Sequence, residues 1–296
     1  MTQIQLDHVT ELLRHSPLDL GGEVGKARTV FEEMIGALPV PDDVRTQPVS
    51  LGGVPALEVH AGSDRAEGTL LYFHGGAYAV GSAASSVNLV ADLARRTGVA
   101  AFTVDYRLAP ENPFPAAIED AVAAYRALLE QGVRPESIAV VGESAGGGLA
   151  LALLLAIKDA GLAQPAAAAV LSPWADLTQS GASMQSRAEQ DPALTRAALQ
   201  TRAQDYLAGA DPRDPLASPA FADLRGLPPL LVQVGGNEIL LDDALRIAAR
   251  AAHADVPVTL RTFPGAPHVF QGFAPVLDEG AAALDEAALF LRGRLQ

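Results

Sequence analysis

Apolar segments of strand length alternate with amphipathic helical segments along most of this chain. Six short runs are apolar through most of their length, and they cover residues 68–74, 99–106, 137–142, 166–172, 228–235 and 257–263. Helical patterns separate them over 85–98, 116–132, 147–161 and 242–255, and a last one covers 284–295. Apolar strands that alternate with helices favour a parallel sheet covered on both faces. The sequence therefore predicts the α/β class with a mostly parallel, doubly wound sheet.

Two further strand-like runs lie before this alternation, within residues 46–62. They flank the pair Gly52 and Gly53, and two such runs around a glycine pair predict a β-hairpin. The number of expected strands is therefore eight.

Two segments do not fit the alternation. Residues 1–45 look helical and end in "LPVPDD" at 38–43, whose two prolines predict a linker. Residues 178–218 are more than a simple strand–helix–strand connection needs. We expect one structural domain, with residues 46–177 and 219–296 as its core and the other two segments as a helical cap over the ligand-binding end of the sheet.

The charge of the chain argues against nucleic acid and membrane surfaces as partners. With 35 acidic and 21 basic residues, its net charge is −14, so it repels phosphate backbones and anionic lipid. The chain has no cysteine, which excludes disulfides and cysteine nucleophiles. Its most apolar run, 149–157, is far shorter than the roughly 20 residues that span a bilayer. Because the first residues also lack the apolar core of a signal peptide, we expect a cytoplasmic protein without a membrane span.

The segment "VVGESAGGG" at 140–148 contains a single serine, Ser144, between glycines. A strand pattern precedes it and a helical pattern follows it. In that setting, Gly-x-Ser-x-Gly is typical of a nucleophilic serine on a strained turn with its hydroxyl exposed. A Cβ at Gly142 or Gly146 would crowd such a turn. The alternative is an ordinary serine in a glycine-rich connection, so the interpretation depends on partner residues elsewhere.

A second glycine-rich turn, "FHGGAY" at 73–78, follows the strand-like run at 68–74. Gly75 and Gly76 can present backbone N–H groups to an oxyanion without obstructing side chains, and the N–H of Ala145 can supply a third donor. Alternatively, the glycines only make a turn. We expect His74 to orient this loop rather than to transfer protons.

A general base would have to be one of six histidines. They are His8, His15, His60, His74, His253 and His268. His268 is the best candidate because it lies in "FPGAPHVF", directly after the last predicted strand, where a doubly wound sheet presents residues to a ligand. A loop histidine without a catalytic role is the alternative.

An acid that orients the base should lie between the serine and the histidine along the chain. The segment "GGNEILLDD" follows the strand-like run at 228–235 and contains three candidates, Glu238, Asp242 and Asp243. Glu238 lies nearest the end of the strand and is preferred. The two aspartates fit a helix N-terminus, where the helix dipole favours carboxylates whatever the chemistry. Asp242 stays the alternative acid.

Longer motifs extend from about residue 45 to the end of the chain. They are "YFHGGAYAVGS", "VDYRLAPENPFPAAIEDA", "VGESAGGGLA", "LSPWADLT", "SPAFADLRGLPPLLVQVGGNEILLDD" and "FPGAPHVF". Together they resemble the bacterial hormone-sensitive-lipase-like esterases (family IV) of the α/β-hydrolase superfamily. The resemblance implies the α/β-hydrolase fold, a nucleophile–acid–base triad of Ser144, Glu238 and His268, and an oxyanion hole built by Gly75, Gly76 and Ala145. It implies no metal or organic cofactor.

This chain departs from the family pattern at two places. Ala77 replaces the usual third glycine of the oxyanion loop, and we expect the hole to survive because Gly75 and Gly76 remain. The segment "EILLD" stands where the family commonly has Asp-Pro-Leu-x-Asp. This correspondence aligns Glu238 with the acid and Asp242 with the second aspartate.

The expected function is hydrolysis of short to medium acyl esters through an acyl-enzyme intermediate. A lactone hydrolase or a deacetylase with the same triad is the enzymatic alternative, and a ligand receptor with a hydrolase fold is the non-enzymatic one. The expected partner is a small-molecule ester or lactone. If the strand at 257–263 lies at the edge of the sheet, its unpaired backbone groups could also support a homodimer.

Overall fold

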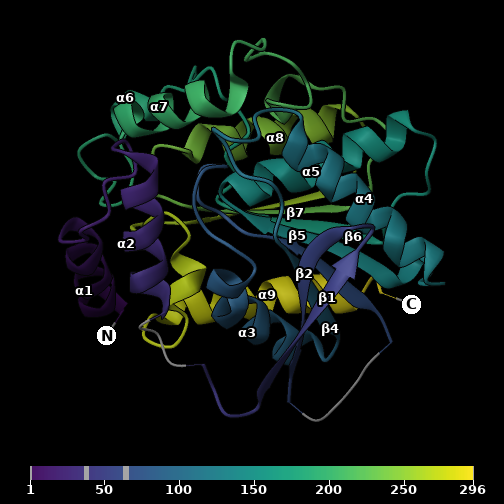
Figure 1. The fold of residues 1–296 in the computed structure, drawn as a ribbon. Coiled ribbons are helices and arrows are strands. Elements are labelled where there is room, and N and C mark those ends of the chain that lie inside the picture. The colour runs from purple at the N-terminus through teal and green to yellow at the C-terminus, as the bar shows by residue number, and fades with distance from the viewer. Residues whose placement is uncertain (1, 37–39, 63–66, 296) are drawn as a thin grey trace.

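The computed structural model describes residues 2–36, 40–62 and 67–295, and within them one sheet has the strand order β1-β2-β4-β3-β5-β6-β7-β8 (Figure 1). The strands are β1 (Val44–Leu51), β2 (Val54–Ala61), β3 (Thr69–Phe73), β4 (Ala100–Val104), β5 (Ile138–Glu143), β6 (Ala167–Leu171), β7 (Leu230–Gly235) and β8 (Val258–Phe263). All eight expected strands are present, so the predicted α/β class and the eight-stranded sheet are confirmed.

The sheet is parallel except at one end. β1 pairs antiparallel with β2, and β2 pairs antiparallel with β4, whereas every pair from β4 to β8 is parallel. The β1–β2 hairpin closes between Leu51 and Val54 through Gly52 and Gly53, whose φ angles are 61° and 89°. Positive φ at both central residues is the geometry of a two-residue hairpin loop, and glycine adopts it without strain. The predicted hairpin is confirmed.

Helices cover both faces of the sheet (Figure 1). The α-helices of the core are α3 (Val87–Thr97), α4 (Ala116–Glu130), α5 (Ala145–Asp159), α8 (Leu241–His253) and α9 (Asp278–Arg292). Helices α3 and α9 pack on one face, and α4, α5 and α8 pack on the other. Alternate residues of a central strand accordingly enter different cores: Leu71 and Phe73 face α5, whereas Leu70 and Tyr72 face α3. These strands are apolar throughout because neither face meets water.

The direction of chain winding reverses between β3 and β5, which are neighbours in the sheet. The chain leaves β3 toward α3 on one face and leaves β5 toward α5 on the other. In doubly wound sheets, ligands bind in the crevice beyond the carboxyl ends of strands at such a reversal. The glycine-rich turns after β3 and β5, which contain Gly75 and Ser144, therefore meet at this crevice.

Two parts of the chain lie outside the sheet and its covering helices. The first contains α1 (Thr2–Arg14) and α2 (Val24–Gly36), and the second contains α6 (Ser183–Ser186) and α7 (Arg196–Leu207). They touch, since Arg202 on α7 donates to the carbonyl oxygen of Gly22 at 3.1 Å. The predicted linker at 38–43 begins at residues 38 and 39, which lie outside the described residues. In the described parts of the chain, no helix combines the length and apolar character needed to cross a membrane.

Candidate active site

Ser144 occupies the sharp turn between β5 and α5. Its φ and ψ angles are 54° and −123°, a strained combination for a residue with a side chain. Two glycines allow this turn: a Cβ at Gly142 would overlap the carbonyl oxygen of Gly146, and a Cβ at Gly146 would overlap that of Phe73. The strained turn and the need for glycine at both positions agree with the expectation from the sequence.

The side chains of Ser144, His268 and Glu238 form a continuous hydrogen-bonded row. Nε2 of His268 lies 2.9 Å from Oγ of Ser144, and Nδ1 lies 2.6 Å from Oε2 of Glu238. The serine follows β5, the acid follows β7 and the histidine follows β8, so three strand ends supply the row. Glu238 is fully buried, and His268 is 9% exposed. The structure thus brings together the three residues that the sequence singled out.

The Glu238 carboxylate has further hydrogen-bond donors. Its Oε1 accepts from the backbone N–H of Gly235 at 2.6 Å and from the hydroxyl of Ser172 at 2.7 Å. With Nδ1 of His268 on Oε2, both carboxylate oxygens have partners, as a buried charge requires. Such a carboxylate can fix the ring orientation of the histidine and stabilise its cation.

The charges around His268 favour its protonated form. Burial alone would lower the pKa of the imidazole, but Glu238, followed by Asp191 and Glu143, outweighs burial and leaves the pKa above the usual 6.5. Asp191 belongs to the segment before α7. Its Oδ2 accepts from the N–H of Ile239 at 2.8 Å, which holds it beside the loop that contains Glu238.

The turn after β3 differs from the expectation for Gly75. Its N–H donates to Oε1 of Glu143 at 2.8 Å, so it is not free to meet an oxyanion. Within the described chain, the N–H groups of Gly76, Ala77 and Ala145 have no hydrogen-bond acceptor. Gly76 is required for this geometry, since its φ is 112° and a Cβ there would overlap the carbonyl oxygen of Val80. The geometry supports Gly76, Ala77 and Ala145 as oxyanion donors and does not support Gly75.

Glu143 is a site residue that the sequence analysis missed. It lies between Gly142 and Ser144, and its carboxylate reaches across to the neighbouring turn. Burial raises the pKa of Glu143 to about 7, against the opposing effects of the Gly75 N–H and His268. An acidic residue directly before a nucleophilic serine is a signal that could have suggested this link between the two turns.

His74 anchors the same turn, as expected. Its Nδ1 lies 2.7 Å from the carbonyl oxygen of Gly75, and its ring stacks on Tyr106 with centroids 4.3 Å apart. Burial lowers the pKa of His74 to about 4, so the ring stays neutral near neutral pH. The His74 ring orients the loop and forms no hydrogen bond with Ser144 in the described structure.

The two other acidic candidates lie in the first turn of α8, as their pattern suggested, and have structural partners. Oδ2 of Asp242 accepts from the N–H of Ser183 at 2.9 Å. Oδ2 of Asp243 accepts from the N–H groups of Ala175 and Asp176, both at 2.8 Å. Neither carboxylate forms a hydrogen bond with His268 in the described structure, so the geometry favours Glu238 as the acid.

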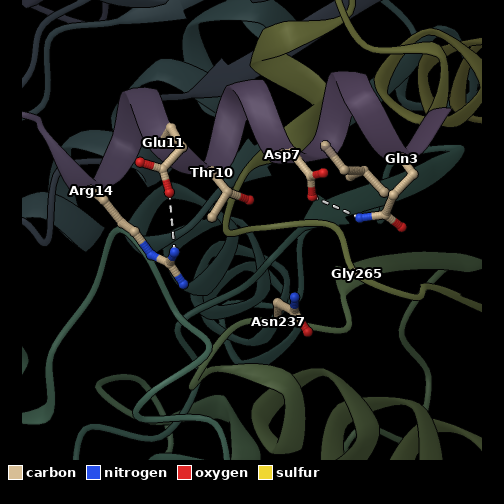
Figure 2. A pocket seen from close by; sticks show the side chains of 8 residues that line it. Gln3, Asp7, Thr10, Glu11, Arg14, Asn237 and Gly265 are labelled. Atoms are coloured by element: carbon tan, nitrogen blue, oxygen red, sulfur yellow. Dashed lines mark hydrogen bonds and ion pairs between the residues drawn. The ribbon is translucent and has the colours of Figure 1, made fainter. Parts of the chain in front are cut away.

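An open cavity of about 250 Å³ lies between α1 and the loops after β7 and β8 (Figure 2). Its lining consists of Gln3, Leu6, Asp7, Thr10, Glu11, Arg14, Asn237 and Gly265. Four of the polar side chains that line it pair along α1, Gln3 with Asp7 and Arg14 with Glu11. The cavity borders the loops that contain Glu238 and His268, but no member of the hydrogen-bonded row lines it.

Known proteins resemble this chain over its length. Residues 70–272 match a family model described as alpha/beta hydrolase fold. An acetyl-hydrolase from Streptomyces hygroscopicus is 47% identical, over 99% of this chain and 97% of its own. An esterase from Acinetobacter venetianus is 38% identical, over 93% of this chain and 91% of its own.

Solved structures agree with these sequence matches. The crystal structure of an esterase from the bacterial hormone-sensitive lipase (HSL) family superimposes with a TM-score of 0.96 and 43% identity, covering 99% of both chains. The structure of EstE5 soaked in ethyl alcohol superimposes with a TM-score of 0.95 and 41% identity, covering 98% of both chains. At such identities the similarity extends beyond the fold to the family.

Proposed function

We propose that Ser144, His268 and Glu238 perform the reaction of this chain, which belongs to the hormone-sensitive-lipase-like esterases of the alpha/beta hydrolase fold. Like the other members of that family, it hydrolyses carboxylic esters. The observation that supports this proposal is the row from Ser144 Oγ through the imidazole of His268 to the Glu238 carboxylate, with separations of 2.9 and 2.6 Å. Nucleophile, base and acid need these contacts in this order.

The proposed reaction has two steps. First, Nε2 of His268 takes the hydroxyl proton of Ser144 while Oγ attacks the ester carbonyl carbon. The bond to the alcohol oxygen then breaks, and the alcohol leaves with the proton from Nε2. In the second step, water gives a proton to His268 and attacks the acyl-enzyme; the acid leaves, and Ser144 regains its proton.

The negative oxygen of each tetrahedral intermediate needs hydrogen-bond donors. We assign the N–H groups of Gly76, Ala77 and Ala145 to this oxyanion hole, because they have no acceptor among the described residues and flank Ser144 in the two neighbouring turns. The N–H of Gly75 instead fixes the turn through Glu143. This assignment replaces Gly75 of the sequence prediction with Ala77.

Short acyl groups are the proposed substrates. The names of two relatives, at 47% and 36% identity, refer to acetyl hydrolysis, which favours acetyl esters and keeps deacetylation as a specific form of the activity. Residues 1–45 and 178–218 would cap the pocket. Contacts of Arg28 on α2 with the loops after β3 and β4 support this role, as do those of Leu6 on α1 with the loop after β8.

Hydrolysis of p-nitrophenyl esters from acetate to dodecanoate tests both the triad and the acyl preference. Wild type should prefer the short chains, and Ser144→Ala should lose about 10⁶-fold in kcat. Equal rates for the two proteins would refute the triad. A panel of lactones measured in parallel distinguishes an esterase from a lactone hydrolase, which would hydrolyse the lactones faster than the esters.

We also propose a homodimer through β8. This strand is the last in the sheet order, and Thr259, Arg261 and Thr262 on it are exposed. An open edge of this kind can pair with a second copy. A monomer mass in light scattering would rule out the dimer.

A cytoplasmic location stays a prediction, which cell fractionation can check.

A further inference from the structure

Ser172, directly after β6, contacts the proposed acid and the loop of the proposed base at once. Its hydroxyl donates to Oε1 of Glu238 at 2.7 Å and accepts from the N–H of Val269 at 3.2 Å. Val269 follows His268 in the chain. One fully buried hydroxyl therefore bridges the carboxylate to the backbone beside the imidazole.

The residue that makes this bridge has a strained backbone. Its φ is 48°, in the left-handed region that residues with a Cβ rarely adopt. Its own N–H donates to the carbonyl oxygen of Gln233 at 2.7 Å, which ties the turn to β7. Strained, buried residues persist where the surrounding structure fixes them, and they are frequent at functional sites.

The turn that contains Ser172 also touches the nucleophile. The N–H of Ser144 donates to the carbonyl oxygen of Leu171, and the N–H of Trp174 donates to that of Ser144, both at 2.9 Å. Residues 171–174 thus contact the backbone of the serine, the side chain of the acid and the chain beside the base. These segments come from three different strand ends.

We propose that Ser172 is a positioning residue of the hydrolysis, whose hydroxyl holds the Glu238 carboxylate in register with His268. The proposal rests on the triad assigned above. Oε1 has two donors, the Gly235 N–H and the Ser172 hydroxyl, and together they prevent the carboxylate from rotating. Oε2 then stays directed at Nδ1 of His268.

Ser172→Ala removes the hydroxyl, and Ser172→Gly removes it while also relieving the backbone strain. Both variants should lose about 10- to 100-fold in kcat on p-nitrophenyl acetate, the size expected for a hydrogen bond to a charged group, with KM within about twofold. The acid limb of kcat/KM should move to lower pH, because a carboxylate that is no longer held against Nδ1 of His268 stabilises the imidazolium less. Asp191 and Glu143, the other carboxylates acting on His268, are unchanged in these variants.

Ser86→Ala is the matched control. Ser86 is also buried, and its hydroxyl has two partners, the carbonyl oxygen of Ala83 and the hydroxyl of Thr103, away from the triad. This variant should change melting temperature without changing kcat or the acid limb. Should Ser172→Ala not fold, Ser172→Gly gives the result, since glycine suits a φ of 48°.

A wild-type kcat in Ser172→Gly would overturn the proposal. A lower kcat with an acid limb at the wild-type pH would also overturn it, because a purely structural role of Ser172 predicts that result. Ser144→Ala, measured alongside, distinguishes this failure from that of the triad. If Ser144→Ala stays active, the proposed function fails. If only the Ser172 variants behave as wild type, the positioning role alone fails.

Discussion

Nδ1 of His268 lies 2.6 Å from Oε2 of Glu238, although the two residues are 30 positions apart in the chain. Neighbouring parallel strands explain the contact, because β7 and β8 end at the same edge of the sheet and each residue follows one of these ends. The contact also distinguishes Glu238 from the two aspartates on α8, which satisfy backbone N–H groups elsewhere.

Replacing the acid should therefore cost far more activity than replacing its sequence alternative. Glu238→Gln keeps the size of the side chain but removes the charge that stabilises the imidazolium, so kcat should fall by about 10³- to 10⁴-fold. Asp242→Asn weakens only the bond to the Ser183 N–H and should change kcat by less than about threefold. Steady-state kinetics on p-nitrophenyl acetate gives the ranking, and the reverse ranking would move the role to Asp242.

The pH profile should follow the raised pKa of His268. A protonated imidazole cannot accept the Ser144 proton, so kcat/KM should be lost as the pH falls through that pKa, with an acid limb above 6.5. Asp191→Asn removes a negative charge that favours the imidazolium. The acid limb should consequently move to lower pH, by less than about one unit.

Asp159→Asn serves as the control for this titration. Asp159 ends α5, and a helix of 15 residues separates it from Ser144 by roughly 20 Å, beyond the screening length at physiological salt. The acid limb of kcat/KM in the Asp159→Asn variant should coincide with that of wild type. A limb that stays in place in both variants would exclude Asp191 as a source of the shift.

The strands and long helices were predictable because their patterns repeat over several residues. The exceptions are informative. α9 begins at Asp278, six residues before the predicted segment at 284–295, since "DEGAAA" has no apolar stripe to indicate a helix. The four residues of α6 are too few to show any periodicity.

The proximity of Ser144, Glu238 and His268 was predictable because each of them follows a predicted strand, and the carboxyl ends of parallel strands lie at the same edge of the sheet. The N–H groups that we propose as oxyanion donors were not predictable in full. Which N–H groups remain free depends on the path of the turn after β3, where Ala77 has a φ of 52°, and on the side chain of Glu143 that takes the Gly75 N–H. Neither the path of the turn nor the contact of Glu143 can be inferred from the presence of glycines in the motif.

The turn around Ser144 should tolerate no side chain at Gly146. A Cβ there would overlap the carbonyl oxygen of Phe73, which is backbone of a central strand and cannot move aside. Gly146→Ala should destabilise the protein by more than about 3 kcal/mol and abolish activity. Gly272→Ala is the control because a Cβ at that exposed position meets open space. Urea unfolding measures both, and similar midpoints would contradict the close approach.

Arg28 on α2 should fix the N-terminal helices to the core. Its Nε donates to the carbonyl oxygen of Ala79 at 2.7 Å, and its Nη2 donates to that of Ala109 at 2.8 Å. It also forms a two-pronged ion pair with Glu111. The ion pair is half exposed and contributes little, so most of the expected loss comes from the two carbonyl bonds.

Arg28→Ala should therefore lower the free energy of unfolding by about 2 kcal/mol and the melting temperature by about 3 °C. KM for p-nitrophenyl esters should rise, because Ala79 lies in the loop after the oxyanion turn and the cap would lose its attachment there. The matched variant is Arg225→Ala, whose ion pair with Asp223 is exposed and local, so its melting temperature and KM should stay at wild-type values. Equal effects of the two substitutions would mean that α2 is not held in place through Arg28.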